Sequence, residues 1–504
     1  MIFSIKNFLQ VVVILIVTQL SKAQSFRTPQ QYEAELGGYT ATVHRTPFWL
    51  QTNQFGIVPT KTPTLSVRAS AFVDYDSARI NARKLDFGYG IRVIGNAGSA
   101  GSLLLPELYI KARYCALELS MGRRQEVLGL VDTTLSSGSY SWSGNALPLP
   151  KIQLAIMTFT AIPFTKGWVS FMGSFAHGYM NPTGFVNHSM LHQKTLYLRV
   201  GRQRDVVRLY GGFTHQAIWG GKIDNLALIN NPDVAKENQL PSKFRDYAYV
   251  VTGLRLPGPD DAKRLTNFDY TNRIGNHLGN IDVGADIDLV SYSLFLYRQS
   301  FFDDGSLYYL LNIADGLNGI RLRRNNPDAL VRDLLVEYLN TSSQGGSEFV
   351  IDDPLRRGRD NYFNHSQFRD GWTYKQRGIG TPFITPALGS KGEWPYGTFT
   401  NNNRVRVAHV GLAGSLPTAG WLFFTDRVQY QAKFSMSRNY GTYDFPFPTP
   451  VNQFSGIVNF TAPITALDGL LLTTSVAVDA GQLYTNNIGL YVGVRKVWHN
   501  CNNR

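Results

Sequence analysis

The stretch Thr64-Leu-Ser-Val-Arg-Ala-Ser-Ala-Phe-Val73 decides the fold class, because its side chains alternate in character along the chain. Successive side chains of an extended strand point to opposite sides, so this stretch has one apolar or small face and one largely polar face. The pattern predicts a half-buried β-strand. The apolar face consists of Leu65, Val67, Ala69, Ala71 and Val73.

The same alternation recurs along the chain, broken by Gly, Asn, Asp and Pro, and predicts further strands within residues 196–200, 281–296, 405–412 and 488–498. Residues 292–297 and 307–313 flank a turn around Asp303-Asp304-Gly305 and predict a hairpin. The best candidate for a helix, residues 327–339, also contains β-branched residues and is predicted to be a strand. The chain therefore belongs to the all-β class.

Composition excludes several other classes of protein. The chain has 504 residues, of which only 17% are charged and 13% are aromatic, which argues against a disordered, solvated polypeptide. A mean hydropathy of −0.15 argues against a bundle of membrane helices. The only two cysteines, Cys115 and Cys501, exclude a disulfide-rich scaffold and a multi-cysteine metal site.

The first 23 residues predict a secretory signal peptide. Lys6 is followed by an apolar run over residues 8–17 and by Ser21-Lys22-Ala23, a cleavage pattern of small residues. The run is too short to span a bilayer as a helix, which needs about 20 apolar residues. Removing Lys6 and Lys22 lowers the formal net charge from +13 to +11, so the exported chain stays basic.

An exported all-β chain forms either soluble sandwiches or an outer-membrane barrel. Aromatic residues flank many of the expected strands here, as they do at both membrane interfaces of a barrel. At roughly 25 residues per strand and connection, the exported chain supplies about 16 to 20 strands. We therefore expect residues 24–60 to form a periplasmic lead-in segment and residues 61–504 a closed antiparallel transmembrane β-barrel. Residues 222–245 and 342–403 are expected to be long extracellular loops.

Chemical motifs are nearly absent from the sequence. It contains no Gly-x-Ser-x-Gly, no His-Glu-x-x-His, no phosphate-binding loop and no Cys-x-x-Cys. His188 and His192 are four residues apart, but a strand places them unlike a helical metal site, so no metal or cofactor is expected. The paired carboxylates at 303–304 and 352–353 are typical of turns, and the basic run at 356–359 is typical of an exposed loop.

Three regions carry a resemblance to a known family. They are Leu105-Pro-Glu-Leu-Tyr-Ile-Lys-Ala-Arg-Tyr114 with Gly122-Arg-Arg-Gln-Glu126, Leu191-His-Gln-Lys194 with Leu209-Tyr-Gly-Gly-Phe-Thr-His-Gln-Ala-Ile-Trp-Gly-Gly221, and Asp360-Asn-Tyr-Phe-Asn364 with Gly371-Trp-Thr-Tyr374 and Gly380-Thr-Pro-Phe383. From about residue 60 to its end, the chain resembles the Wzi-type capsule assembly family of outer-membrane proteins, in its Bacteroidetes-like form.

The resemblance implies a barrel of about 18 strands in the outer membrane of a Gram-negative bacterium, without enzyme activity. It implies lectin-like binding of capsular polysaccharide and a role in assembling or attaching the capsule at the cell surface. The well-known members carry a periplasmic helical segment, whereas residues 24–60 show no strong helix. The expected partners are outer-membrane lipid and capsular or other surface polysaccharide, with no nucleic acid, and the chain is expected to be a monomer.

Arginine and aromatic residues in these regions are the candidate polysaccharide-binding residues. Arginine presents a planar fork to carboxylates, and aromatic rings offer apolar faces to sugar rings. For the aromatic residues the alternative is interface or lumen packing, for Arg113 it is pairing with Glu107, and for the neighbouring glycines it is strand kinking. The candidates are Arg113, Arg123, Arg124, His215, Gln216, Trp219, Tyr362, Trp372 and Tyr374.

Three other functions stay open at this stage. An outer-membrane channel for small or hydrophobic solutes would conduct ions in planar bilayers. A hydrolase would need a catalytic cluster that no motif in the sequence indicates. A soluble periplasmic protein would be extracted without detergent.

Overall fold

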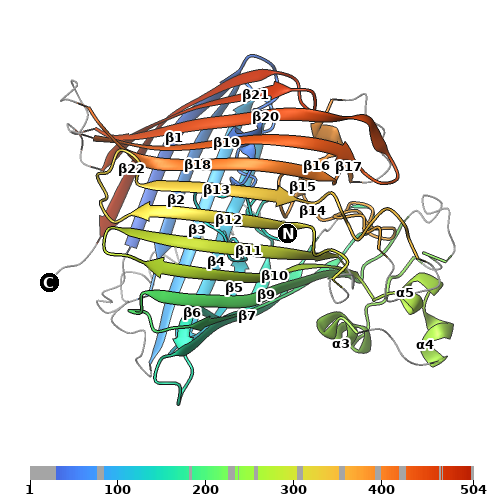
Figure 1. Ribbon diagram of the computed structural model, residues 1–504. Coiled ribbons are helices and arrows are strands. Elements are labelled where there is room, and N and C mark those ends of the chain that lie inside the picture. The colour runs from blue at the N-terminus through green and yellow to red at the C-terminus, as the bar shows by residue number, and fades with distance from the viewer. Residues whose placement is uncertain are drawn as a thin grey trace, which may run out of the picture.

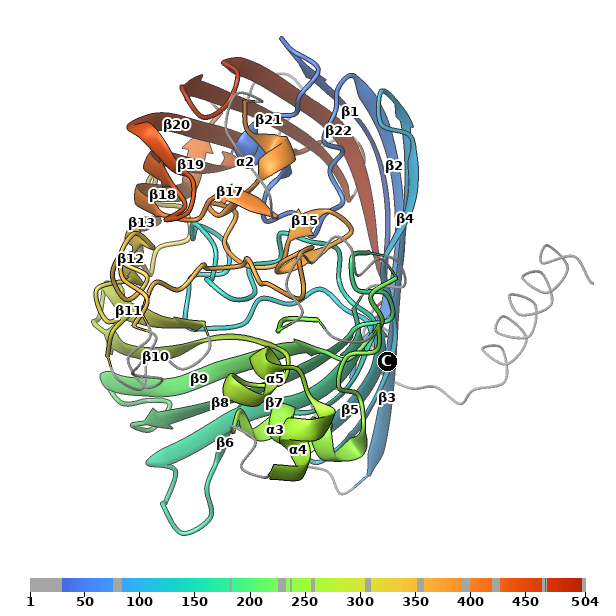
Figure 2. The same cartoon turned by 90° about the vertical axis from the view of Figure 1, so that its right-hand side faces the viewer.

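Eighteen strands form one closed antiparallel sheet, as expected (Figures 1 and 2). The computed structural model describes residues 30–75, 84–180, 184–224, 233–235, 238–254, 259–303, 310–350, 358–391, 399–418, 427–464, 467 and 469–500. The predicted signal peptide lies outside the described residues, as do Asp304, the 352–353 pair, residues 356–357 and Cys501. The barrel strands are β1 (Gln30–Ala41), β2 (Thr64–Val73), β3 (Leu85–Gly98), β4 (Ser102–Tyr114), β5 (Leu117–Arg123), β6 (Lys151–Ala161), β7 (Val169–Tyr179), β8 (Met190–Val200), β9 (Val207–Trp219), β10 (Asn276–Asp288), β11 (Tyr292–Asp303), β12 (Gly316–Arg324), β13 (Asp333–Asn340), β18 (Val405–Pro417), β19 (Arg427–Gly441), β20 (Pro446–Pro463), β21 (Leu470–Gly481) and β22 (Asn487–Asn500).

Strand β1 closes the barrel by pairing with β22, with Gln30 opposite Asn500 and Tyr39 opposite Tyr491. Residues 30–41, expected within a periplasmic lead-in, are therefore the first barrel strand, and that expectation is wrong for them. Gly37 allows the closure, because a Cβ atom there would lie within 2.4 Å of the Tyr491 hydroxyl.

The two ends of the barrel differ in the length of their connections. The end that holds Gln30 and Asn500, here called the terminal end, has short turns such as residues 115–116 and 289–291. The opposite end, here called the loop end, carries long connections. The expected loops 222–245 and 342–403 belong to the β9–β10 and β13–β18 connections at this end, but residues 358–391 and 399–403 fold into the barrel instead of extending from it. The long connections comprise residues 42–63, 124–150, 220–275 and 341–404.

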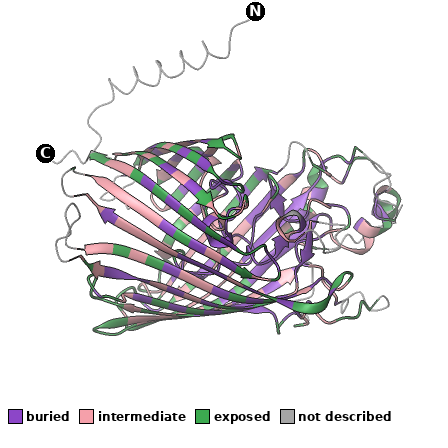
Figure 3. Cartoon of the chain, turned by 90° about the horizontal axis from the view of Figure 1, so that it is seen from above, coloured by how far each residue is buried: buried purple, intermediate pink, exposed green. Residues whose placement is uncertain are grey.

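Side chains alternate across the wall, with apolar residues outside and polar residues inside. Exposed and buried positions alternate along the strands accordingly (Figure 3). On β2, Leu65 and Val67 are 51% and 52% exposed, whereas Ser66 is 1% exposed. An apolar outer face and a polar inner face are the pattern of barrels that stand in lipid. No helix among the described residues is long and apolar enough to cross a membrane.

Two expected strand boundaries change. Residues 310–313, expected within the second strand of a hairpin with 292–297, form turns. The next strand along the chain that pairs with β11 is β12. Residues 281–296 hold the end of β10 and the start of β11 rather than one strand. The strand expected over 327–339 is confirmed for residues 333–339, which belong to β13, and is wrong for residues 327–332, which form turns and bends.

Short elements occupy the long connections. Helix α2 (Phe48–Gln51) and the two-stranded pairs β14 (Thr373–Tyr374) with β15 (Arg377–Gly378) and β16 (Thr385–Pro386) with β17 (Thr400–Asn402) lie within the barrel outline when it is viewed along its axis (Figure 2). A single 3-10 turn, η4 (Ala387–Gly389), follows β16. The β9–β10 connection forms α3 (Phe244–Thr252), α4 (Pro259–Arg264) and α5 (Asn267–Thr271).

Candidate functional site in the barrel lumen

Segments of three connections from the loop end fold back into the barrel and are here called the plug: residues 42–63, residues 124–150, and residues 358–391 together with 399–403. Large side chains from all three are almost completely buried, among them Trp49, Tyr140 and Trp372. The Tyr140 ring stacks on Phe301 of the inner wall, with ring centroids 3.8 Å apart. These side chains belong to one apolar cluster with inward residues of the strands, so the plug forms the core that a barrel of this width would otherwise lack.

Polar side chains of the inner wall hold the backbone of residues 124–150. Asp282 on β10 accepts a 2.8 Å hydrogen bond from the Leu130 N–H, and Gln299 on β11 accepts a 3.1 Å bond from the Tyr140 N–H. Glu337 on β13 accepts a 2.6 Å bond from the Ser137 N–H. A buried backbone N–H without an acceptor is costly, so these inward residues fix the path of the plug.

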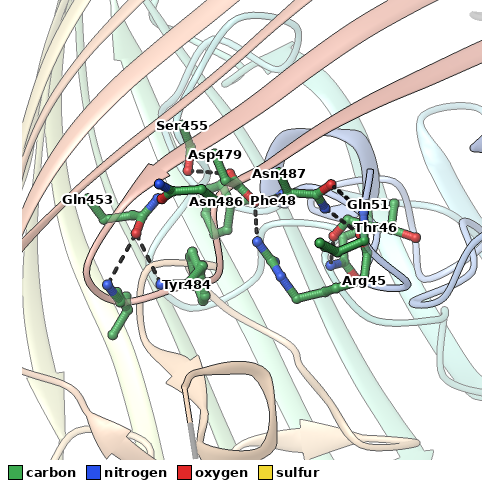
Figure 4. Close-up of polar contacts among 12 residues, drawn as sticks. Arg45, Thr46, Phe48, Gln51, Gln453, Ser455, Asp479, Tyr484, Asn486 and Asn487 are labelled. Carbon is green, nitrogen blue, oxygen red and sulfur yellow. Dashed lines mark hydrogen bonds and ion pairs between the residues drawn. The ribbon is translucent and has the colours of Figure 1, made fainter. Parts of the chain in front are cut away.

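A second set of contacts ties the first plug segment to β20, β21 and β22 (Figure 4). Asp479 accepts hydrogen bonds from the Phe48 N–H at 2.9 Å and from the Ser455 hydroxyl at 2.7 Å, and it forms an ion pair with Arg45. The Arg45 guanidinium also lies 4.5 Å from the centroid of the Tyr484 ring. One buried carboxylate therefore anchors the start of α2.

The plug segments also bind one another. The Trp372 indole N–H donates a 3.2 Å hydrogen bond to the Ser141 carbonyl, and the Thr381 N–H donates a 2.9 Å bond to the Tyr140 carbonyl. Half-buried Arg377 donates hydrogen bonds to the carbonyls of Gln51 and Val58, at 3.3 and 2.5 Å. Burial lowers the pKa of Arg377 to about 10. The three segments therefore form one body.

Burial and hydrogen bonding shift the pKa values of two aspartates in the loop-end connections, Asp132 and Asp315, in opposite directions. Burial alone would raise the pKa of Asp132, yet bonds donated by Leu135, Thr134 and Arg321 hold it below its ordinary value. For Asp315, burial outweighs the bond donated by the Tyr362 hydroxyl at 2.9 Å, and its pKa is raised.

Four arginines on the inner wall form what we call the arginine strip: Arg68 on β2, Arg92 on β3, Arg113 on β4 and Arg124 just after β5. The strip extends from Arg124, the first residue of the second plug segment, to Arg113, near the terminal end. Each guanidinium is paired with an inward carboxylate. The pairs are Arg68–Glu35 at 3.3 Å, Arg92–Glu107 at 3.5 Å, Arg113–Asp86 at 3.0 Å and Arg124–Glu118 at 2.6 Å.

Every arginine of the strip also lies over an aromatic ring, an arrangement that fixes a guanidinium by a cation–π contact. Because the inner cations are matched by carboxylates, the strip offers hydrogen-bonding groups and ring faces but little net charge. The contacts are Arg68 over Tyr491 at 5.7 Å, Arg92 over Phe72 at 5.2 Å, Arg113 over Tyr75 at 4.3 Å and Arg124 over Tyr109 at 5.5 Å.

The structure separates the nine predicted residues into three groups. Arg113 and Arg124 belong to the strip, and Arg123 donates a 3.0 Å hydrogen bond to the hydroxyl of Tyr374 in the plug. The alternative pairing of Arg113 with Glu107 is wrong, because six residues along one strand span about 20 Å. Arg113 instead binds Asp86 on the neighbouring strand.

The second group lies inside the plug or against it. Gln216, Tyr362 and Trp372 are fully buried, and the Gln216 amide donates a 2.9 Å hydrogen bond to the Ser141 carbonyl. Tyr362, Trp372 and the nearly buried Tyr374 pack in the lumen, which is the alternative given for the aromatic candidates.

The third group, His215 and Trp219, lies on the opposite face of β9 from Gln216, outside the barrel. Helix α3 covers this face, and its Tyr247 ring stacks on Trp219 with centroids 5.0 Å apart. His215 Nε2 lies 2.9 Å from His277 Nδ1 on β10. Gly220 and Gly221, with φ of +64° and +97°, follow the strand and turn the chain away from the barrel.

Several residues that organise this site were not among the predicted ones. In the sequence, Asp282 is a polar residue within the alternating stretch 281–296, and Glu337 lies between Val336 and Tyr338. An acidic residue at an inward strand position is the available signal, but alternation alone does not say what it binds.

Comparison with known proteins establishes the fold. No protein-family model matches the chain, and no curated protein matches its sequence. Among solved structures it is similar to Wzi, an Escherichia coli outer-membrane protein involved in group 1 capsule assembly and a carbohydrate-binding β-barrel, with a TM-score of 0.55, 14% identity, and 96% of this chain and 87% of that chain covered. It is also similar to Pseudomonas aeruginosa OccK5 (TM-score 0.46, 8% identity, 94% and 98% covered) and Acinetobacter baumannii OccAB4 (TM-score 0.46, 10% identity, 94% and 99% covered). The similarity to Wzi agrees with the closed 18-stranded antiparallel barrel seen here and shows that the fold resembles that of an outer-membrane barrel.

Proposed function

We propose that this protein is a non-enzymatic outer-membrane barrel that binds capsular or other surface polysaccharide and helps to attach it at the cell surface. The proposal includes export by the signal peptide, with the loop end facing outward and the chain acting as a monomer. The similarity to Wzi, a carbohydrate-binding β-barrel, supports it.

The observation that carries the proposal is the arginine strip beside a filled lumen. Sugars are bound by planar polar side chains that reach several hydroxyl groups and by aromatic faces that accept the ring. Arg92 and Arg124 supply such guanidinium groups, Glu107 and Glu118 supply acceptors, and the Tyr109 ring lies beside them. Arg92 and Arg124 keep side-chain exposures of 21% and 25%, so part of each guanidinium is free to contact a ligand.

The charge pairing refines the substrate class. A strip of unpaired arginines would favour strongly acidic chains, whereas these four arginines are all matched by carboxylates. We infer that hydroxyl groups provide most of the contacts and that the ligand carries few negative charges. Arg123 with Tyr374 extends the same surface to the plug.

A glycan array with the detergent-purified protein tests the proposal. We expect retained glycans with wild type and roughly tenfold weaker binding after the double substitution R92Q/R124Q, since each change removes charge-assisted hydrogen bonds. The matched control is R202Q/R324Q, which removes two exposed arginines at the terminal end. Absence of any bound glycan, or equal weakening by both double variants, contradicts the proposal.

The channel alternative makes a different prediction. The plug fills the barrel with packed side chains from three segments. Because the lumen is filled, we expect the barrel not to conduct solutes. Planar bilayers containing the purified protein should show no stepwise current. Stepwise currents from wild-type protein would favour the channel function instead.

A further inference from the structure

Two arginines lie directly opposite each other on neighbouring strands at the loop end. Arg406 of β18 pairs in register with Arg438 of β19, and Arg404 precedes β18 by one residue. Like charges placed directly across an antiparallel pair destabilise the sheet. The fold alone gives no reason for this cluster of Arg404, Arg406 and Arg438, here called the rim cluster.

The rim cluster faces outward, away from the lumen. Val405 and Val407 are buried on the inner side of β18, so Arg406 between them points to the outer side, where it is exposed, and Arg438 opposite it is exposed as well. In this respect the cluster is the reverse of the arginine strip, whose arginines face inward.

The guanidinium groups are held mainly by neutral partners, and the Asp315 carboxylate acts on Arg404 from a distance without an ion pair between them. Arg404 and Arg406 each use Nε, donating 3.1 Å hydrogen bonds to the carbonyl and the hydroxyl of Ser342. Arg404 lies 3.8 Å from the Tyr443 ring centroid, and all three arginines lie within 6.0 Å of the Tyr440 ring centroid. Among the residues that the structure describes, no carboxylate forms an ion pair with any of the three.

An apolar surface continues from the cluster toward the terminal end. On β18 and β19 the next outward pair is Ala408 with Met436, and Met436 is 54% exposed. Tyr338 of β13 lies beside Ala408 and forms the edge of an outer-wall groove of about 540 Å³. The outward residues of the groove include Leu296, Ile320 and Val336.

We propose that the rim cluster binds the phosphate groups of a lipid of the outer leaflet, whose acyl chains lie on the apolar wall and in its groove. Guanidinium forks match phosphate oxygens bidentately, and one multivalent anion would neutralise the otherwise repelling Arg406–Arg438 pair. An acidic polysaccharide would also neutralise the arginines of the rim cluster, but it would make no favourable contact with the adjoining apolar surface. This site is separate from the arginine strip, and the inference does not rest on the proposed polysaccharide function.

The test compares variants of the full mature chain in detergent micelles, using native mass spectrometry to measure binding of diphosphoryl lipid A. The triple variant R404Q/R406Q/R438Q removes the cluster. The matched control R202Q/R204Q/R324Q removes the same charge from exposed positions at the terminal end. Heat-modifiable migration in SDS gels verifies that each barrel is folded.

We expect the triple variant to bind diphosphoryl lipid A at least about tenfold more weakly than wild type, because each arginine near an anionic lipid contributes severalfold. The control should stay within about twofold, and dephosphorylated lipid A should bind wild type and triple variant equally weakly. Unchanged binding by the triple variant overturns the proposal. So does a triple variant that loses a soluble polyuronate but keeps diphosphoryl lipid A, since the site would then serve acidic polysaccharide.

Discussion

The Asp479 carboxylate on β21 accepts a 2.9 Å hydrogen bond from the backbone N–H of Phe48, a residue 431 positions earlier in the chain. The same carboxylate binds Arg45 and the Ser455 hydroxyl. This inward acid therefore helps to determine where the first plug segment enters the barrel, together with Asn487, which accepts a hydrogen bond from the Val43 N–H.

Replacing this anchor should loosen the plug. Asp479→Asn removes the negative charge that three buried or half-buried donors share, and we expect a loss of about 2–3 kcal/mol in the free energy of unfolding. Denaturant titration of the detergent-solubilised protein measures it. Asp444→Asn is the control, because the Arg359–Asp444 pair is exposed and should contribute under about 1 kcal/mol. Equal effects of the two substitutions would show that Asp479 is no anchor.

Removing the central plug segment should open the lumen. Gly122 of β5 and Lys151 of β6 are register partners, so a short Asn-Gly turn in place of residues 124–150 can join the two strands directly. We expect stepwise currents from this deletion in planar bilayers and none from wild type. The control replaces residues 260–271, which lie in the β9–β10 connection, and this variant should give no stepwise current. A folded plug deletion that carries no current would mean that the lumen is closed by something else.

Acid should loosen the third plug segment through His365. Its Nδ1 accepts hydrogen bonds from the N–H groups of Gln367 and Phe368 at 3.1 and 3.2 Å, which requires an unprotonated nitrogen. Burial lowers the pKa of His365 from 6.5 to about 4. The unfolded chain therefore binds more protons between these values, and stability falls as the pH drops from about 6.5 to about 4.

Hydrogen exchange of residues 358–374 at pH 7 and pH 5 measures this effect. His365→Asn keeps an acceptor for the two N–H groups and should abolish the difference between the two pH values. His188→Asn changes an exposed histidine and should preserve it. A pH effect that survives in His365→Asn would place its origin elsewhere.

The stack of Trp219 on Tyr247 should hold α3 against the outer wall. Trp219→Ala removes a buried ring from this small cluster, and we expect local destabilisation of about 3 kcal/mol. Faster proteolysis within residues 244–254 would report it, while the heat resistance of the barrel stays unchanged. Trp168→Ala removes a half-exposed ring in a terminal-end turn and should leave proteolysis at 244–254 unaltered. Unchanged cleavage in Trp219→Ala would contradict this role.

Much of the barrel is predictable because lipid and lumen select opposite side chains along each strand. Residues 64–73 alternate cleanly and form β2 with the predicted bounds. Strand β1 was missed because its inward positions carry Glu33 and Glu35, which suggest a polar lead-in until their partners Arg495 and Arg68 are known. Residues 310–313 are apolar but do not alternate, and they form turns.

The candidate site was less predictable, for a different reason. A long connection that folds inward has the Gly- and Ser-rich composition of an exposed loop, so nothing local distinguishes residues 124–150 as plug. Arg124 could be selected from its residue type, whereas its pairing with Glu118 depends on strand register. The covering of Trp219 by α3 joins segments whose sequences give no sign that they meet.

The central claim is that this barrel holds polysaccharide at the cell surface. Its most direct test is the amount of cell-bound surface polysaccharide in a strain lacking the protein, complemented with wild type or with R92Q/R124Q. We predict that polysaccharide is released into the medium by the deletion strain, that wild type restores its retention, and that the double variant restores it poorly although it is folded in the outer membrane. Unchanged cell-bound polysaccharide in the deletion strain would contradict the account.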